Sequence, residues 1–483
     1  MSQILASVFF LFLSSPILYI IYKFGLDAAG LFNPGLFWAL KNSLIQGLIS
    51  SALCILGGVL FSRGLQKISD SMRARLRFLA LIPMLLPSLF SVLVAMNVLW
   101  IFPYGHWGVI FVYVLIYLGY ATFFIYDCQQ KQLNQLGFLA EVYGLNRWSF
   151  FRRVYFKLMQ MDLFSLFIFI FTCTLASLTV PMMAGGGRGT NFEVYLYEKI
   201  YLDAQWSSAA VLLLFQLLAM LILSRFVGRA HFSEKQLAYI PSRYLSSKTS
   251  LYFFVAYLLV YFIPISIQML RSIVEADLNQ IFVTEILNGL RGSLQVYLGL
   301  IILFFLFVFK MSFYYFYGLR MSYFRVFQNM SAVVVGFASL IFWPKTGFAF
   351  SYFSVLFCAS FIYFLGLYFT YFDPIFRKMQ DSFLTAQIYH IPFRTVFKKI
   401  IWPQIKKPFS ISLGLLALIV SMDFVFVFVS GATYTTLGTV FESYLSSYRM
   451  SMALVVAAVG IVFSLLVYLL MRFVYVDDKK SEL

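Results

Sequence analysis

Residues 144–158, GLNRWSFFRRVYFKL, are matched 246 positions later by residues 390–404, HIPFRTVFKKIIWPQ. Both stretches combine aromatic and basic residues, in a chain of which 62% is hydrophobic and only 11% is charged. The matched residues are Phe151 and Phe397, Arg152–Arg153 and Lys398–Lys399, and Val154 and Ile400. The return of a cationic, amphipathic stretch at one offset indicates that the chain consists of two similar halves.

Long apolar runs flank both stretches. The mean hydropathy of +0.87 and the low charged fraction exclude an ordinary soluble domain, in which about 25% of residues are charged. Runs of about twenty apolar residues predict membrane-crossing helices, which span the hydrocarbon core and satisfy their own backbone hydrogen bonds. The sequence therefore predicts an all-α polytopic membrane protein of about twelve transmembrane helices in two pseudo-repeated six-helix halves. The runs are residues 3–22, 43–62, 78–101, 108–127, 160–184, 209–227, 250–270, 292–311, 327–344, 350–372, 409–430 and 452–472.

The basic residues predict the orientation of these helices. With the N- and C-termini in the cytoplasm, most of the 36 Lys and Arg residues fall in inner loops, as the positive-inside rule requires. The net charge of +17 then reflects topology, and basic residues spread over many loops do not favour nucleic-acid binding. The run 3–22 lacks a basic leader and a small-residue cleavage site, which favours a retained helix over a signal peptide.

A polar segment interrupts the middle of the chain. We expect residues 1–230 to form the first half, residues 231–248 a cytoplasmic linker, and residues 249–483 the second half. The offset of 246 that relates the two cationic stretches also pairs Gly185 with Gly431, after the next apolar run. Internal duplication is common in transporters, whose substrate paths form between the repeats.

The cationic stretches lie in the two loops at residues 138–158 and 384–404. Each loop predicts two short amphipathic helices joined by a turn, with the basic residues on the polar faces. Val142, Leu145 and Trp148 are expected on one apolar face, and Phe150, Phe151 and Val154 on the next. One such loop alone favours a helix lying on the inner leaflet, with its cations at anionic lipids. Two matched copies favour a docking element for a cytoplasmic partner.

This pattern resembles the cytoplasmic coupling loop, or EAA loop, of binding-protein-dependent ABC importer permeases. The general form is E-A-A, three residues, G, about nine residues, and I-x-L-P. The first copy keeps Ala140 and Gly144 but has Phe138 for the Glu and Lys157 for the Pro. The second copy keeps Ala386, Ile400 and Pro403 but has Leu384 for the Glu and His390 for the Gly. Because histidine adopts left-handed turns less easily than glycine, we expect the second loop to bend differently or to bind its ATPase more weakly.

The resemblance implies a function. It implies an inner-membrane permease on whose loops two copies of a separate ABC ATPase dock, with ATP and Mg²⁺ on that partner and no cofactor on this chain. It also implies a periplasmic or extracellular solute-binding protein that delivers the solute. The coupling residues that it implies are Ala140, Glu141, Gly144, Arg147, Arg152, Arg153, Ala386, Gln387, His390, Arg394, Lys398 and Pro403.

The resemblance extends to a subgroup of that family. Residues 175–214 and 421–458 look like the regions after the two loops in double-length permeases, which import thiamine, iron(III) or phosphonate. The segment SYLSSYRMSMA, residues 443–453, looks most like the thiamine permeases. Thiamine is therefore favoured over iron(III) as the solute.

Other polar residues are candidates for the translocation path. Asp423 lies inside a predicted membrane run, and a charge at that depth tends to face a cavity or a partner. Ser177 is its counterpart in the first half at the same offset. The alternative role for Asp423 is a structural hydrogen bond to a neighbouring helix.

Catalytic chemistry has little support in the sequence. The stretch GGGRGT, residues 185–190, lacks the lysine order of a phosphate-binding loop and is expected to be an outer turn. The three histidines lie far apart and the four cysteines have no CxxC spacing, so neither a catalytic nor a metal site is predicted. Aromatic runs such as FVYVLIY, residues 111–117, predict lipid-facing belts.

Two other classes remain as alternatives. An ion-coupled secondary transporter needs intramembrane carboxylates or histidines, of which Asp423 is the clearest candidate. A polytopic membrane enzyme needs clustered acids, histidines or a nucleophile in one loop, and the sequence offers no such cluster.

Overall fold

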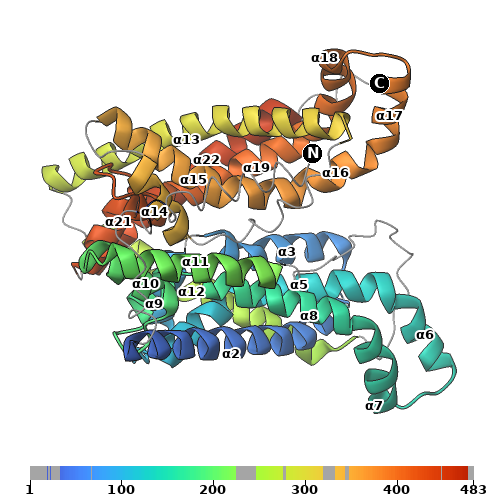
Figure 1. The fold of residues 1–483 in the computed structure, drawn as a ribbon. Helices are drawn as coiled ribbons and strands as arrows, with labels where there is room; N and C mark the ends of the chain where they lie inside the picture. The colour runs from blue at the N-terminus through green and yellow to red at the C-terminus, as the bar shows by residue number, and fades with distance from the viewer. Residues whose placement is uncertain are drawn as a thin grey trace. The chain divides into compact units, whose positions relative to one another are not determined.

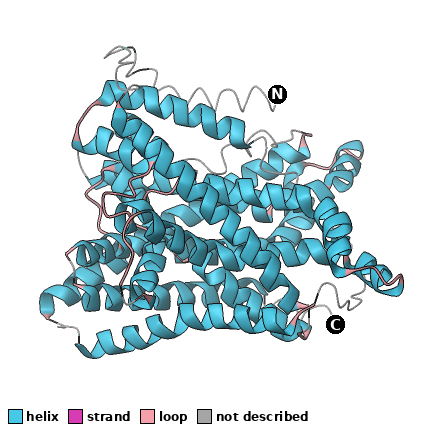
Figure 2. Cartoon of the chain, turned by 90° about the horizontal axis from the view of Figure 1, so that it is seen from below, coloured by secondary structure: helices cyan, strands magenta, loops and turns pink. Residues whose placement is uncertain are grey.

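The computed structural model describes Tyr19, Tyr22 and residues 33–476, apart from residues 67, 87, 100, 225–245, 276–278, 319–331, 343–347 and 448. In this part of the chain the regular elements are helices, and none is a strand (Figure 2), which confirms the all-α class. Apart from Tyr19 and Tyr22, the predicted helix at 3–22 lies outside the described residues, as does most of the predicted linker at 231–248.

Eight of the described helices are long and apolar enough to cross a membrane. The chain is therefore a multi-pass membrane protein. These helices are α2 (Pro34–Leu65), α5 (His106–Gln132), α8 (Phe156–Leu175) with its preceding turns, α12 (Lys248–Glu275), α13 (Gln280–Phe316), α15 (Phe348–Tyr371), α19 (Trp402–Met422) with its preceding turns, and α22 (Met450–Val476).

Three further predicted spans contain described helices, and one of these spans is bent. Where one helix was expected over 78–101, α3 (Asp70–Leu85) and α4 (Ser88–Val98) meet at a bend of 99°. Within the described residues, α11 (Trp206–Ser224) covers the span expected at 209–227 and α14 (Ala332–Phe342) covers the span expected at 327–344. Hydropathy reports how apolar a run is and does not report where its backbone bends.

The described chain packs into two compact units. The N-unit contains Pro34–Tyr195 and residues 246–268, and the C-unit contains Leu196–Ser224 and residues 269–476. Helix α11 of the first half thus packs in the C-unit, and most of α12 packs in the N-unit. Packing units and sequence repeats are different properties, so the boundary expected at 231–248 stays a prediction.

Small residues bring the helices of the N-unit close together. Helix α2 packs on α5 and α8, and α3 packs on α5. A Cβ atom on Gly119 of α5 would lie 2.0 Å from the carbonyl oxygen of Ala80 in α3, so only glycine permits this approach. Helix α12 is linked to α5 by the Tyr257 hydroxyl, which donates to the carbonyl of Leu115 at 2.8 Å.

Aromatic rings fill the core of the C-unit. Phe304 of α13 is fully buried and stacks on Phe409 of α19, with ring centroids 5.7 Å apart, and it packs on Phe364 of α15 at 5.0 Å. In the N-unit Tyr113, from the run FVYVLIY, is 1% exposed. The expectation that this run forms a lipid-facing belt is therefore wrong at Tyr113, because the ring packs between helices.

Each unit carries short helices at both of its ends. In the N-unit, α6 (Asn134–Val142) and α7 (Arg147–Phe150) lie at the end away from α9 (Thr179–Ala184) (Figure 1). In the C-unit, α17 (Gln380–Ile388) and α18 (Phe393–Val396) lie at the end away from α21 (Leu437–Ser446) (Figure 1). The two cationic stretches therefore occupy corresponding places in the two units.

Candidate functional site

The first loop turns at Gly144. The amide of Gly144 donates to the Glu141 carbonyl at 3.1 Å, and the amide of Leu145 donates to the Ala140 carbonyl at 3.0 Å. These bonds close α6, and Gly144 has a left-handed φ of +64°. The Asn146 side chain then accepts from the Trp148 amide at 3.2 Å and caps α7. The sequence thus supplies a glycine stop and an asparagine start within three residues.

The second loop repeats these contacts at the same offset. The amide of His390 donates to the Gln387 carbonyl at 3.0 Å, and the amide of Ile391 donates to the Ala386 carbonyl at 2.9 Å. His390 has a φ of +52°, close to that of Gly144. The expectation that the second loop bends differently is wrong, because His390 adopts the left-handed conformation that glycine takes in the first loop.

Exchanging the residues at this turn is expected to change stability. Because the left-handed conformation costs an L-residue about 1–2 kcal/mol, His390→Gly is expected to raise the melting temperature by roughly 2–4 °C. Gly144→Ala is expected to lower it by a similar amount, since an added Cβ meets nothing within 4 Å and only the backbone is strained. Thermal unfolding of the full chain in detergent measures both shifts. His390→Ala is the control, and a gain as large as that of His390→Gly would show that the imidazole and not the backbone carries the strain.

A wider helical turn follows each short helix. Residues Phe151–Tyr155 (η2) and Phe397–Ile401 (η5) form π-helical turns that lead into α8 and α19. Such turns are rare and often mark functional sites. Their occurrence at matched positions shows that the repeat extends to the details of backbone geometry.

The loops are fixed to their units by small and aromatic residues. Ala140 is 4% exposed and packs in a core cluster with Phe150 and Tyr155, while Ala386 is 2% exposed and belongs to the C-unit core. Phe150 is buried and Phe151 is 40% exposed, stacking on Tyr155 at 5.0 Å. The expected shared face of Phe150 and Phe151 is therefore wrong, because successive helical residues point about 100° apart.

Both loops carry exposed apolar side chains. Val142 and Tyr143 are 65% and 79% exposed, and their counterparts Ile388 and Tyr389 are both 73% exposed. We call these two pairs the apolar tips. Sequence reasoning did not place Tyr143, Ile388 or Tyr389 among the site residues, although the offset of 246 that matched the basic residues also matches these pairs.

The remaining predicted loop residues differ in exposure. The basic residues Arg147, Arg152, Arg153, Arg394 and Lys398 are exposed. Glu141 is partly buried, and Gln387 donates from its amide to the carbonyl of Phe316, which ties α17 to the end of α13. Pro403 lies exposed in the first turn of α19, directly after η5.

Comparison with known proteins relates this architecture to a transport family. Residues 54–233 match the family described as binding-protein-dependent transport system inner membrane component. The thiamine transport system permease protein ThiP of Escherichia coli (strain K12) is 24% identical over 216 residues, and that of Salmonella typhimurium is 25% identical over 216 residues. Each alignment covers 40% of this chain and 40% of the length of the relative.

Residues 54–233 are similar to the permease domain of this family. This confirms the resemblance read from the sequence. The matched residues include the first loop, with Gly144 and its apolar tip. The second loop lies beyond the matched residues, and its likeness to the first rests on the hydrogen bonds, the left-handed turn and the π-helical turn described above.

The helix that follows the first loop is broken. Helix α8 ends at Leu175 and α9 begins at Thr179, so the span expected over 160–184 is not continuous. Ser177 lies in this break, where its carbonyl accepts from the Asn191 side chain at 2.9 Å. The apolar run hides the break because residues on both sides of it are hydrophobic.

The C-unit contains the corresponding break. Helix α19 ends at Met422 and α20 (Val425–Ser430) follows, so Asp423 lies between two helices and not inside a continuous one. One carboxylate oxygen accepts from the Val425 amide at 3.0 Å, and the other accepts from the Tyr363 hydroxyl. No basic side chain among the described residues forms an ion pair with Asp423. The structure thus supports the hydrogen-bonding role.

The glycine-rich stretch of the N-unit, residues 185–190, is a structural turn. Asn42 of α2 donates to the Thr190 carbonyl at 2.9 Å, and Gln46 donates to the Gly189 carbonyl at 2.9 Å. Gly186 and Gly187 have left-handed φ values of +51° and +73°. The turn therefore packs on α2, in the N-unit end that lies away from α6 and α7 (Figure 1).

Proposed function

We propose that this chain is the membrane-spanning permease subunit of an ATP-driven ABC importer. The observation that carries the proposal is the pair of matched loops. Each loop has an exposed apolar tip and a buried alanine, Ala140 or Ala386, that packs in the core of its unit. Exposed apolar side chains surrounded by polar residues are typical of protein interaction sites. A helix held only by lipid contact has no need of the same left-handed turn and the same hydrogen bonds in both units.

The proposed partners follow from the family of the permease domain. Two copies of a separate ATPase, which binds ATP and Mg²⁺, would dock on the loops near residues 138–158 and 384–404. A solute-binding protein would deliver solute at the other face of the membrane. This assignment places both termini in the cytoplasm and the chain in the bacterial inner membrane, in accord with the positive-inside pattern.

Transport would proceed by alternating access. Closure of the ATPase pair would move α6–α7 and α17–α18, and the buried anchors Ala140 and Ala386 would pass that motion to the bundles. Because packed interiors deform little, a displaced loop moves its helices as rigid bodies. The chain would catalyse no bond chemistry itself.

Thiamine is the favoured solute, ahead of iron(III). The relatives at 24% and 25% identity are named thiamine permeases. Thiamine carries a positive charge, and the helix breaks at Ser177 and Asp423 would border the translocation path, with Asp423 offering a carboxylate to a cationic solute. Buried charges without a partner in a membrane often mark such paths.

An ion-coupled secondary transporter is the second candidate. Asp423 is the observation that favours it, because a carboxylate at membrane depth can carry a proton. In that case the chain would move solute without an ATPase, and the apolar tips would have no catalytic partner to contact.

Reconstitution separates the two candidates. The full chain is placed in liposomes with the ATPase and the solute-binding protein encoded beside it, and thiamine or iron(III) is added. An importer subunit gives solute-stimulated ATP hydrolysis and solute uptake that needs ATP. Uptake driven by a proton or sodium gradient, with no retained ATPase, would instead establish the secondary transporter.

A further inference from the structure

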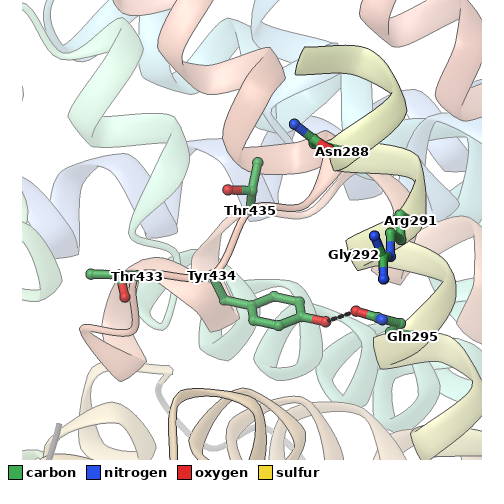
Figure 3. Close-up of a pocket in the computed structure, with 7 residues that line it drawn as sticks. All are labelled: Asn288, Arg291, Gly292, Gln295, Thr433, Tyr434 and Thr435. Carbon is green, nitrogen blue, oxygen red and sulfur yellow. Dashed lines mark hydrogen bonds between the residues drawn. The ribbon is translucent and has the colours of Figure 1, made fainter. Parts of the chain in front are cut away.

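A polar pocket lies beside α13 in the C-unit. Its volume is about 330 Å³, and Figure 3 shows α13 side chains facing the segment after Gly431 across it. Gly292 shapes the pocket, because a Cβ there would lie 1.9 Å from the Thr435 carbonyl oxygen and push the segment away. The lining residues are Asn288, Arg291, Gly292, Gln295, Thr433, Tyr434 and Thr435.

The pocket presents a positive charge and hydrogen-bond donors. Among the described residues no carboxylate pairs with Arg291, and Glu285, nearer the start of α13, already accepts from the Tyr444 hydroxyl. Burial raises the pKa of Tyr434 to about 12, so its hydroxyl stays protonated and donates to Gln295 Oε1 at 2.6 Å (Figure 3). With Oε1 engaged, the Gln295 amide keeps its NH₂ group for another acceptor.

Arg291 also belongs to an apolar stripe along α13. Leu287, Leu294 and Leu298 are 57%, 43% and 52% exposed, and their spacing places them on one helix face with Arg291. Ile302, 62% exposed, continues the face. The apolar run of α13 was predicted to begin at residue 292, which puts Arg291 at the boundary where lipid headgroups meet the hydrocarbon core.

We propose that this pocket binds the phosphate-bearing headgroup of a membrane phospholipid, with its acyl chains along the exposed stripe. The guanidinium of Arg291 would bind the phosphate oxygens in the bidentate manner that arginine favours, and the side-chain amides of Asn288 and Gln295 would donate to the remaining oxygens. The apolar stripe directly below the charge is what distinguishes a lipid from a free anion. This inference requires only that the chain crosses a membrane and does not depend on the transported solute.

The first half offers a matched control residue. Lys41 of α2 stands before the sequence NSLIQGL as Arg291 stands before GSLQVYL, and it is likewise exposed. Its ammonium group lies over the Trp38 ring, 5.8 Å from the centroid, and is therefore already engaged. Lys41 and Arg291 are thus both cations near the membrane boundary, but only Arg291 lines the pocket.

The test uses native mass spectrometry of the full chain in detergent. Phosphatidylglycerol is titrated into the wild type, Arg291→Gln, Arg291→Lys and Lys41→Gln. The loss of charge-assisted hydrogen bonds predicts at least about tenfold weaker binding for Arg291→Gln, partial recovery for Arg291→Lys, and wild-type binding for Lys41→Gln. Diacylglycerol, which has the same chains and no phosphate, is expected to bind the wild type no better than it binds Arg291→Gln.

Two results would overturn the proposal. If Arg291→Gln and Lys41→Gln weaken phosphatidylglycerol binding equally, the lipid is held by general charge attraction and not by the pocket. Complete displacement of the lipid from the wild type by an equal concentration of inorganic phosphate would show that the acyl chains contribute nothing and that the site holds a free anion. Size-exclusion profiles matched to the wild type establish that each variant is folded.

Discussion

Replacing Val142 and Ile388 together by glutamate is expected to reduce solute-stimulated ATP hydrolysis at least about tenfold and to prevent co-purification of the ATPase. Both side chains are more than half exposed, so the helices beneath them should fold unchanged. An apolar anchor that becomes a carboxylate must lose its hydration on docking, and central anchors of this kind contribute about 2 kcal/mol or more to an interface. Each 1.4 kcal/mol is a factor of about ten in affinity.

The single variants and a distant control make this prediction specific. Val142→Glu alone and Ile388→Glu alone are each expected to weaken one docking site and to lower stimulated hydrolysis partly. Leu202, 70% exposed in η3 (Glu198–Leu202) of the C-unit, provides the control, and Leu202→Glu is expected to leave ATPase retention unchanged. Full hydrolysis in the double variant would mean that the apolar tips contact lipid and not the partner.

The sequence predicts much of this protein because its strongest signals are long and periodic. Apolar runs identify most membrane helices, since lipid admits only helices that satisfy their own backbone. The offset that joins residues 144–158 to 390–404 predicts two short helices and a turn in each unit, and both are present. The hydropathy of a twenty-residue run changes little when one residue is substituted. A single motif position is lost by one substitution, as where Phe138 and Leu384 stand in place of the motif Glu.

Such patterns do not predict the backbone conformation of single residues. His390 takes a left-handed conformation because the bonds to Ala386 and Gln387, and the burial of Ala386, fix the turn regardless of the residue that occupies it. The helix breaks at Ser177 and Asp423 are equally hidden, because hydropathy is high on both sides. Local preference predicts these positions poorly where surrounding contacts determine the backbone.

Contacts between distant segments are also invisible in the sequence. Nothing near Arg291 indicates that residues 433–435 pack against it, because the contact depends on Gly292 meeting a carbonyl more than 140 positions away. The packing of α11 in the C-unit and of α12 in the N-unit has no sequence signal either. Such features arise from how helices assemble, which a periodicity does not encode.

Asp423→Asn is expected to lower thiamine uptake at least about tenfold while the variant remains folded and retains the ATPase. Asparagine can still accept from the Val425 amide and hydrogen-bond the Tyr363 hydroxyl, so the break between α19 and α20 keeps its contacts. What it loses is the negative charge that would pair with a cationic solute, and charge-assisted hydrogen bonds contribute about 1.5–3 kcal/mol. Uptake into liposomes, measured beside thermal unfolding, separates the two effects.

Asp423→Ala and Ser177→Ala distinguish a path residue from a structural one. Alanine at 423 removes the acceptor for the first amide of α20, so a loss of about 0.5–2 kcal/mol in stability is expected in addition to the loss of uptake. Ser177→Ala removes no charge, and its backbone carbonyl still accepts from Asn191, so uptake should change little. If Asp423→Asn transports thiamine normally while Asp423→Ala unfolds at lower temperature, the carboxylate serves only to hold the helix break, and the cation must be recognised elsewhere along the path.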